Sequence, residues 1–194
     1  MIQGLYAITP SGLEENDLLF KTEVLLKEGI KLIQYRDKFL DKKTFQEKAR
    51  LLLNLTKKYG AKLVINDHIE ICLEISADGF HLGLEDYSSG GNAELLKKNK
   101  EFIAKNLICG LSCKWNKELV VNPPEKEIKW TYLAVGSFYP SNTKSTIPET
   151  NENVKKKFLS YTDKPLVAIG GINKKNIKDV RSLGYSCFAL SEAL

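Results

Sequence analysis

Short apolar runs alternate with amphipathic segments along the whole chain, and the alternation repeats eight times. Apolar runs bounded by turn residues predict buried strands, whereas leucines spaced three and four apart and followed by glycine predict helices. The expected strands are 5–9, 31–37, 62–67, 79–83, 107–113, 132–139, 165–171 and 187–191. The expected helices are 16–29, 41–60, 92–106, 151–162 and 173–184, with shorter candidates at 69–75 and 115–121.

The order of these elements predicts the fold class. Alternating strands and helices form a parallel sheet covered by helices, and eight such units favour a closed (β/α)8 barrel of the TIM type. A doubly wound open sheet is the alternative, but no G-x-G-x-x-G turn follows the first strand. A length of 194 residues fits one domain, residues 1–194. Because three residues follow Ser191, we expect a short form of the barrel whose last helix is missing or truncated.

Composition narrows the class of protein. With 43% hydrophobic and 27% charged residues, the chain has the make-up of a folded globular domain. No apolar run approaches the roughly 20 residues that span a bilayer, and no signal peptide pattern is present. We therefore expect a cytoplasmic protein. The four cysteines form no C-x-x-C pair, which favours buried thiols over a zinc site.

The net charge of +5 comes mainly from lysines scattered over the expected helices. No arginine-rich arm or aromatic-studded basic stripe predicts binding to nucleic acid, and nothing predicts binding to a membrane. The surplus charge is compatible with small anionic substrates. The oligomeric state stays open, with a homo-oligomer among the alternatives.

Candidate chemistry gathers where the expected strands end, since active sites of (β/α)8 barrels lie at the carboxyl ends of the strands. In the second strand, Gln34, Arg36 and Lys38 alternate with Ile33 and Tyr35 and therefore share one face. Two cations on one face repel each other unless an anion lies between them. This pattern favours a bound diphosphate, with a solvated strand end as the plain alternative.

Two carboxylates follow the next two strands. Asp67 ends the third strand, and Asp86 lies in the loop after the fourth. Adjacent strand ends would bring them together, and such a pair suits Mg²⁺, which keeps several waters and bridges to substrate phosphates. Each aspartate could instead cap a helix. His81 is expected to be a buried, hydrogen-bonded strand residue rather than part of the chemistry.

The later strands offer hydroxyls, a lysine and glycines. Ser112 ends the fifth strand, and Ser141, Thr143 and Lys144 follow the sixth. Glycines after the seventh strand allow the backbone to approach a ligand closely. Because loops after strands seven and eight commonly hold a phosphate in this fold, the sequence predicts a phosphate site there.

Taken together, the strand ends resemble those of the thiamine phosphate synthase family. The segments that carry the resemblance occur in the family's order and cover nearly the whole chain. They are residues 5–9 (LYAIT), 34–38 (QYRDK), 65–67 (IND), 77–83 (ADGFHLG), 85–86 (ED), 143–144 (TK) and 168–172 (AIGGI).

The resemblance implies a set of roles. It implies that a pyrimidine diphosphate is held by Gln34, Arg36, Lys38 and Asn66, and that Mg²⁺ is ligated by Asp67 and Asp86. It implies contacts from Ser112 and Lys144 to the diphosphate or the pyrimidine. It assigns the thiazole carboxylate or phosphate to Ser141, Thr143, Gly171, Leu190 and Ser191. Arg36, Ser112 and Lys144 are the expected catalytic residues.

The resemblance also implies a reaction. Mg²⁺ and the cations would draw off pyrophosphate, and the thiazole nitrogen would capture the remaining pyrimidine methyl cation. Three positions depart from the family's usual residues. They are Lys114 in place of a common histidine, Ser141 in place of a threonine and Ser137 in place of a proline.

Three other functions remain open at this point. A paralogue similar to thiazole tautomerases would keep the barrel but generally lose the metal carboxylates and the diphosphate grip. A sugar-phosphate epimerase or isomerase would need an acid/base pair, which Asp67 and Asp86 could imitate. A catalytically degenerate barrel would bind the phosphate ligand without turnover.

Overall fold

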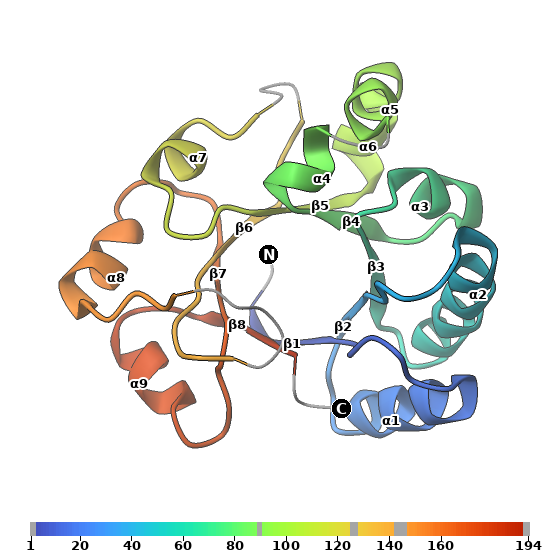
Figure 1. Cartoon of the computed structure of the whole chain (residues 1–194), viewed down its shortest axis with the longest axis horizontal. Helices are drawn as coiled ribbons and strands as arrows, with labels where there is room; N and C mark the ends of the chain where they lie inside the picture. Colours follow the sequence, from blue (N-terminus) through green and yellow to red (C-terminus); the bar gives the residue numbers. More distant parts are fainter. Residues whose placement is uncertain (1–2, 89–90, 125–127, 142–146, 192–194) are drawn as a thin grey trace.

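The computed structural model describes residues 3–88, 91–124, 128–141 and 147–191. Eight parallel strands close into a barrel in sequence order (Figure 1). The strands are β1 (Gly4–Ile8), β2 (Leu32–Tyr35), β3 (Lys62–Asn66), β4 (Gly79–Leu82), β5 (Ile108–Ser112), β6 (Tyr132–Val135), β7 (Leu166–Ile169) and β8 (Cys187–Leu190). Pairing of β1 with β8 closes the ring, so the predicted (β/α)8 fold is confirmed.

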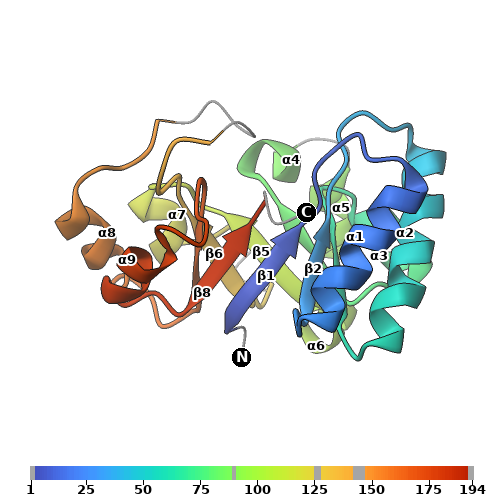
Figure 2. The same ribbon diagram turned by 90° about the horizontal axis from the view of Figure 1, so that it is seen from below.

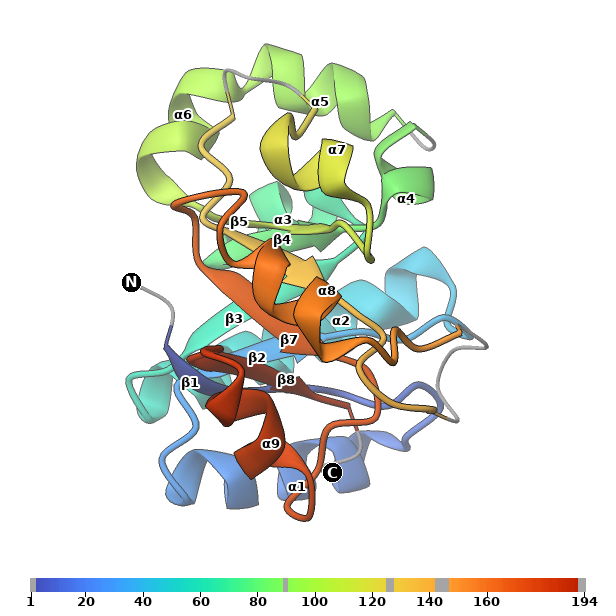
Figure 3. The same ribbon diagram turned by 90° about the vertical axis from the view of Figure 1, so that its left-hand side faces the viewer.

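Helices surround the barrel. They are α1 (Glu15–Lys27), α2 (Lys42–Lys58), α3 (Ile69–Ile75), α4 (Leu84–Ser88), α5 (Asn92–Lys98), α6 (Lys100–Asn106), α7 (Lys117–Val121), α8 (Glu152–Phe158) and α9 (Ile177–Ser182). Figure 3 shows α8 and α9 outside β7 and β8. In Figure 2 the strands are seen from the side, with α4 above their carboxyl ends. The last helix expected to be missing would follow Ser191, outside the described residues.

Side chains alternate between two layers of core. Tyr6, Ile8 and Leu32 belong to a cluster inside the barrel. Ala7, Ile33 and Tyr35 belong to the larger cluster between strands and helices. This alternation follows from the strand period of two. It directs Gln34, two residues after Leu32, into the upper end of the barrel.

Two expected elements differ from the structure, and one helix was not expected. The predicted continuous helix 92–106 is wrong, because it divides at Asn99, whose side chain and backbone amide both donate to the Leu95 carbonyl. The sixth strand ends at Val135 rather than at residue 139. Beyond it, the Phe138 and Tyr139 amides donate to the Ile169 and Gly170 carbonyls outside the regular ladder. Helix α4 was not predicted.

The four cysteines are free and buried, as predicted. Burial raises the pKa of each thiol to about 12. They therefore stay protonated and act as small apolar core residues. Within the described part of the chain, no helix is long and apolar enough to cross a membrane.

Close approach of β4 to β5 requires glycine at position 79. A Cβ atom there would lie 2.1 Å from the Ile108 carbonyl oxygen and 2.7 Å from its Cβ. Gly79→Ala should therefore lower the free energy of unfolding by roughly 2–3 kcal/mol. Urea unfolding would measure the change, with Asn153→Ala at an exposed position on α8 as the control. Equal midpoints for wild type and Gly79→Ala would contradict this packing.

Candidate active site

A pocket opens at the carboxyl ends of the strands. Among the residues that line it are Gln34, Arg36, Lys38, Asn66, Asp67, Asp86, Ser112, Ser141 and Ser191. Most of the predicted site residues therefore surround one cavity. Its apolar lining includes Ile8, Ala134 and Ile169, so the polar groups stand above the packed interior of the barrel.

The end of β2 presents unsatisfied donors to the pocket. Gln34 is 2% exposed, and its Nε2 atom is buried without a hydrogen-bond partner. The Thr9 hydroxyl fixes the backbone of Arg36, since Oγ1 accepts from its amide at 2.9 Å and donates to its carbonyl at 3.0 Å. The Arg36 guanidinium donates to Ser11 Oγ at 3.3 Å. A buried donor without a partner is costly, so this rim is suited to a ligand rich in acceptors.

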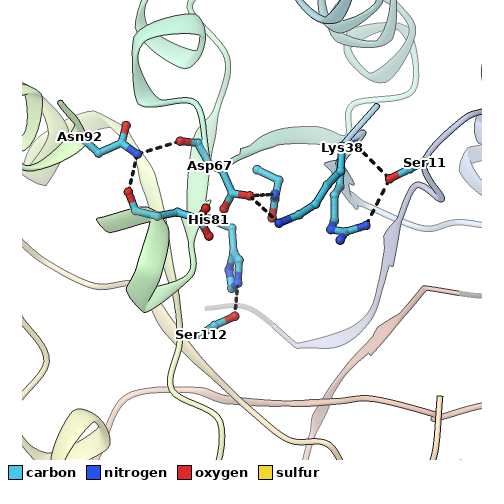
Figure 4. A network of polar contacts seen from close by, with 9 residues as sticks. Ser11, Lys38, Asp67, His81, Asn92 and Ser112 are labelled. Carbon is cyan, nitrogen blue, oxygen red and sulfur yellow. Dashed lines mark hydrogen bonds and ion pairs between the residues drawn. The ribbon is translucent and has the colours of Figure 1, made fainter. Parts of the chain in front are cut away.

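The end of β3 places a carboxylate beside Lys38 (Figure 4). The Lys38 ammonium lies 3.8 Å from Asp67 Oδ2, and Asn66 Nδ2 donates to the same oxygen. Asp67 adopts a left-handed backbone, with φ at 64°. Non-glycine residues rarely take this conformation, and it often marks a functional position.

Asp67 and Asp86 interact unfavourably with each other. Burial, followed by the negative charge of Asp86, raises the pKa of Asp67 from 3.8 to about 6. A cation between the two carboxylates would relieve this repulsion. No group of three or more potential metal-ligating side chains occurs within the described ranges. The pair matches the sparse protein ligation of Mg²⁺, which completes its shell with water and phosphate.

The side-chain amide of Asn92, which the sequence analysis did not identify, connects the segments that carry Asp67 and Asp86. Asn92 is 6% exposed, and its Nδ2 donates to the Asp67 carbonyl at 2.9 Å and to the Asp86 carbonyl at 2.8 Å (Figure 4). The residue begins α5, where an asparagine commonly serves only as a cap, so its role could not be found from the sequence.

His81 is a buried, hydrogen-bonded residue of β4, as predicted. It is 4% exposed, and its Nε2 lies 2.9 Å from Ser112 Oγ (Figure 4). It also lines the pocket. The donor and acceptor roles in this pair depend on which imidazole nitrogen carries the proton.

The loops after β6 and β7 press against each other. Gly170 and Gly171 have φ values of 96° and 65°. A Cβ on Gly170 would lie 2.2 Å from Ser137 Oγ, and one on Gly171 would lie 2.4 Å from the Pro140 carbonyl oxygen. Both glycines are therefore needed for the backbone conformation and for the contact that positions this side of the pocket.

Four predicted site residues stand apart from the pocket lining or cannot be placed. Gly171 and Leu190 are not among the lining residues, and Leu190 packs against the outer core. Thr143 and Lys144 lie outside the described residues. Lys114 lines the pocket instead of the histidine common in the resembled family, and its ammonium lies 3.9 Å from exposed Glu85.

Comparison with known proteins gives a consistent result. The family described as "Thiamine monophosphate synthase" matches residues 5–194. Among curated proteins, the chain is 36% identical to a thiamine-phosphate synthase of Nitrosospira multiformis over 195 residues, covering 100% of this chain and 79% of that protein. It is 31% identical to a thiamine-phosphate synthase of Methanobrevibacter smithii, covering 98% of this chain and 87% of the relative.

Solved structures agree with the sequence comparison. Thiamine phosphate pyrophosphorylase from Pyrococcus furiosus is 29% identical and superposes with a TM-score of 0.77, covering 97% of this chain and 85% of that one. Tryptophan synthase from the same organism is 12% identical with a TM-score of 0.69, and that likeness shows the barrel fold alone.

Proposed function

The chain belongs to the thiamine monophosphate synthase family, and from that premise we propose that this transferase condenses hydroxymethylpyrimidine diphosphate with a thiazole phosphate or its carboxylate. The products are thiamine phosphate and pyrophosphate. One observation carries the proposal: cations, carboxylates and the buried side chain of Gln34 surround one pocket. The cytoplasmic location remains a prediction.

The diphosphate would be held by the ends of β2 and β3. Arg36 and Lys38 supply positive charge, and the guanidinium fork fits two phosphate oxygens at once. The unpartnered Nε2 of Gln34 supplies a donor below them, where an acceptor on the pyrimidine would satisfy it. Asn66 would complete this side, as the resemblance implies.

Asp67 and Asp86 would hold Mg²⁺, and the residues present fit that ion. Burial, followed by the charge of Asp86, raises the pKa of Asp67 to about 6, and a cation held between the two carboxylates would offset that repulsion. When bound, Mg²⁺ neutralises phosphate charge and so favours departure of pyrophosphate. Lys38, 3.8 Å from Asp67, would stand between the carboxylates and the phosphates and contact both.

The protein's own part is to stabilise charge as it moves. The carbon–oxygen bond to the diphosphate breaks, and its electron pair leaves with pyrophosphate, whose growing negative charge faces Arg36 and Lys38. The pyrimidine methyl cation then accepts the lone pair of the thiazole nitrogen. No covalent nucleophile from the enzyme is needed. The barrel end positions the second substrate for capture, with Ser141 and Ser191 on the side proposed for its carboxylate or phosphate.

Incubating the purified protein with both substrates and Mg²⁺ tests this proposal. We expect thiamine phosphate and pyrophosphate in equal amounts, no product after chelation with EDTA and full recovery when Mg²⁺ is restored. Isomerisation of a thiazole phosphate without pyrophosphate release would instead identify a tautomerase. Metal-independent turnover of a sugar phosphate would identify an epimerase or isomerase. Tight binding of thiamine phosphate with no turnover would identify a binding protein.

A further inference from the structure

Three side chains from three adjacent strands form a chain of hydrogen bonds beneath the pocket. The Tyr132 hydroxyl, on β6, lies 2.9 Å from His81 Nδ1. On the other side of the ring, His81 Nε2 lies 2.9 Å from Ser112 Oγ, on β5 (Figure 4). The imidazole and phenol rings stack with centroids 5.5 Å apart. Tyr132 is fully buried, whereas Ser112 lines the pocket, so this series of hydrogen bonds extends from the barrel interior to the site.

The neighbouring strand leaves room for this pair. A Cβ on Gly110 would lie 2.2 Å from Tyr132 Cζ, 2.4 Å from its hydroxyl and 2.5 Å from His81 Nδ1. Gly110 does not have the positive φ angle that often requires glycine at a position. Steric space for the two rings is therefore the reason that glycine fits there, and any larger residue would push the rings apart.

Burial determines which group donates and which accepts in the hydrogen bonds that connect Tyr132, His81 and Ser112. A neutral imidazole has one donor nitrogen and one acceptor nitrogen. The buried hydroxyl of Tyr132 keeps its proton, because desolvation raises its pKa well above the ordinary value. His81 Nδ1 lies 2.9 Å from that hydroxyl, and the side chains of Tyr6 and Gln34 also interact with it. If the phenol donates to Nδ1, the proton of the imidazole lies on Nε2 and is donated to Ser112 Oγ.

We infer that Tyr132, acting through His81, fixes the Ser112 hydroxyl as a hydrogen-bond donor directed toward the bound substrate. Ser112 Oγ accepts from the imidazole, so its own proton is left for the pocket. This inference rests on the proposed function for its consequence: a donor aimed at the diphosphate or the pyrimidine would favour the charge that develops as pyrophosphate leaves. Tyr132 and His81 are then positioning residues, and Ser112 is the residue that touches substrate.

Nitrogen-15 NMR of histidine-labelled protein tests the inference directly. The chain has two histidines, so His68→Gln assigns the signals of His81. In the wild type we expect a neutral ring with the proton on Nε2. In Tyr132→Phe, which keeps the ring and removes the hydroxyl, we expect a mixture of the two tautomers. A wild-type ring protonated on Nδ1, or on both nitrogens, would overturn the inference.

Kinetics provide a second readout. Tyr132→Phe should lower kcat about tenfold while KM for both substrates changes by less than about twofold, since the buried hydroxyl is lost and the groups proposed to bind the substrates remain. In a Ser112→Ala background, the same change should have little further effect, because the hydroxyl it orients is gone. Fully additive losses of kcat in the double variant would contradict the inference that Tyr132 acts through Ser112.

A matched control removes a buried phenolic hydroxyl elsewhere. Tyr185 is 1% exposed and donates to the Lys155 carbonyl at 2.8 Å, away from the imidazole. Tyr185→Phe should leave the His81 tautomer unchanged. If the protein forms no thiamine phosphate at all, the proposed function fails, but the NMR measurement still decides whether Tyr132 orients His81.

Discussion

An Asp67→Asn variant should lose about a thousandfold in synthase activity and yet be more stable than the wild type at neutral pH without Mg²⁺. Asparagine has nearly the same shape and tolerates the left-handed backbone of this position. It carries no charge, so the cost of burying a carboxylate and the repulsion with Asp86 both disappear. Because Asp67 has a pKa raised to about 6, we expect a gain of about 1–2 kcal/mol in the free energy of unfolding.

The gain should depend on pH in a defined direction. The pKa of Asp67 is 3.8 in its ordinary state and about 6 in the folded protein, so the folded chain holds this proton more tightly than the unfolded chain. The stabilisation from protonated Asp67 is complete below roughly pH 4 and is lost as the pH rises through about 6. The stability difference between variant and wild type should therefore be small near pH 4 and largest above about pH 7.

Urea unfolding at several pH values measures this difference, with Asp163→Asn at an exposed position as the control. Mg²⁺ should raise the unfolding midpoint of the wild type and leave that of Asp67→Asn nearly unchanged, because a ligand stabilises only a protein that binds it. Equal stabilisation of both proteins by Mg²⁺ would show that Asp67 is not a metal ligand. A less stable Asp67→Asn protein at neutral pH would contradict the repulsion.

Arg36→Gln should lower kcat/KM for the pyrimidine diphosphate by about a hundredfold to a thousandfold, without loss of stability. The guanidinium is half-buried at the rim, and the structure gives it one hydrogen bond, a 3.3 Å contact to Ser11. Its other donors are thus available to phosphate oxygens. Steady-state kinetics, together with calorimetric titration of pyrophosphate, would measure the effect.

Two further variants make that test specific. Arg50→Gln, on the exposed face of α2, removes the same charge far from the pocket and should behave like the wild type. Arg36→Lys keeps the charge but loses the two-pronged geometry, so its activity should lie between those of wild type and Arg36→Gln. If Arg36→Gln bound pyrophosphate as tightly as the wild type, the proposal that the end of β2 binds the diphosphate would be wrong.

The barrel could be predicted from the sequence because its strands are short apolar runs with clear boundaries. The alternation of Gln34, Arg36 and Lys38 with core residues also placed those side chains correctly on one face. Predicting helix 92–106 as continuous failed at Asn99, where the side chain makes a local hydrogen bond to the Leu95 carbonyl that the apolar pattern does not report.

The parts of the site that the sequence did not predict are those that depend on contacts between distant segments of the chain. Asn92 is an ordinary asparagine until the fold brings two carbonyls to its amide. In the sequence, Tyr132 looks like an ordinary core residue of a strand. Its hydrogen bond to His81 joins two residues that are 51 positions apart. Periodicity reports which face a side chain occupies, but not which group meets it from another strand.

The double hydrogen bond of Asn92 ties the backbones of Asp67 and Asp86 to the start of α5. The amide belongs to the first residue of that helix, and the helix is anchored in the core by fully buried Leu96. Repacking beneath Leu96 would therefore shift both aspartate backbones together. Cation affinity in this barrel could then be retuned by evolution or by design from a position that no substrate ever touches.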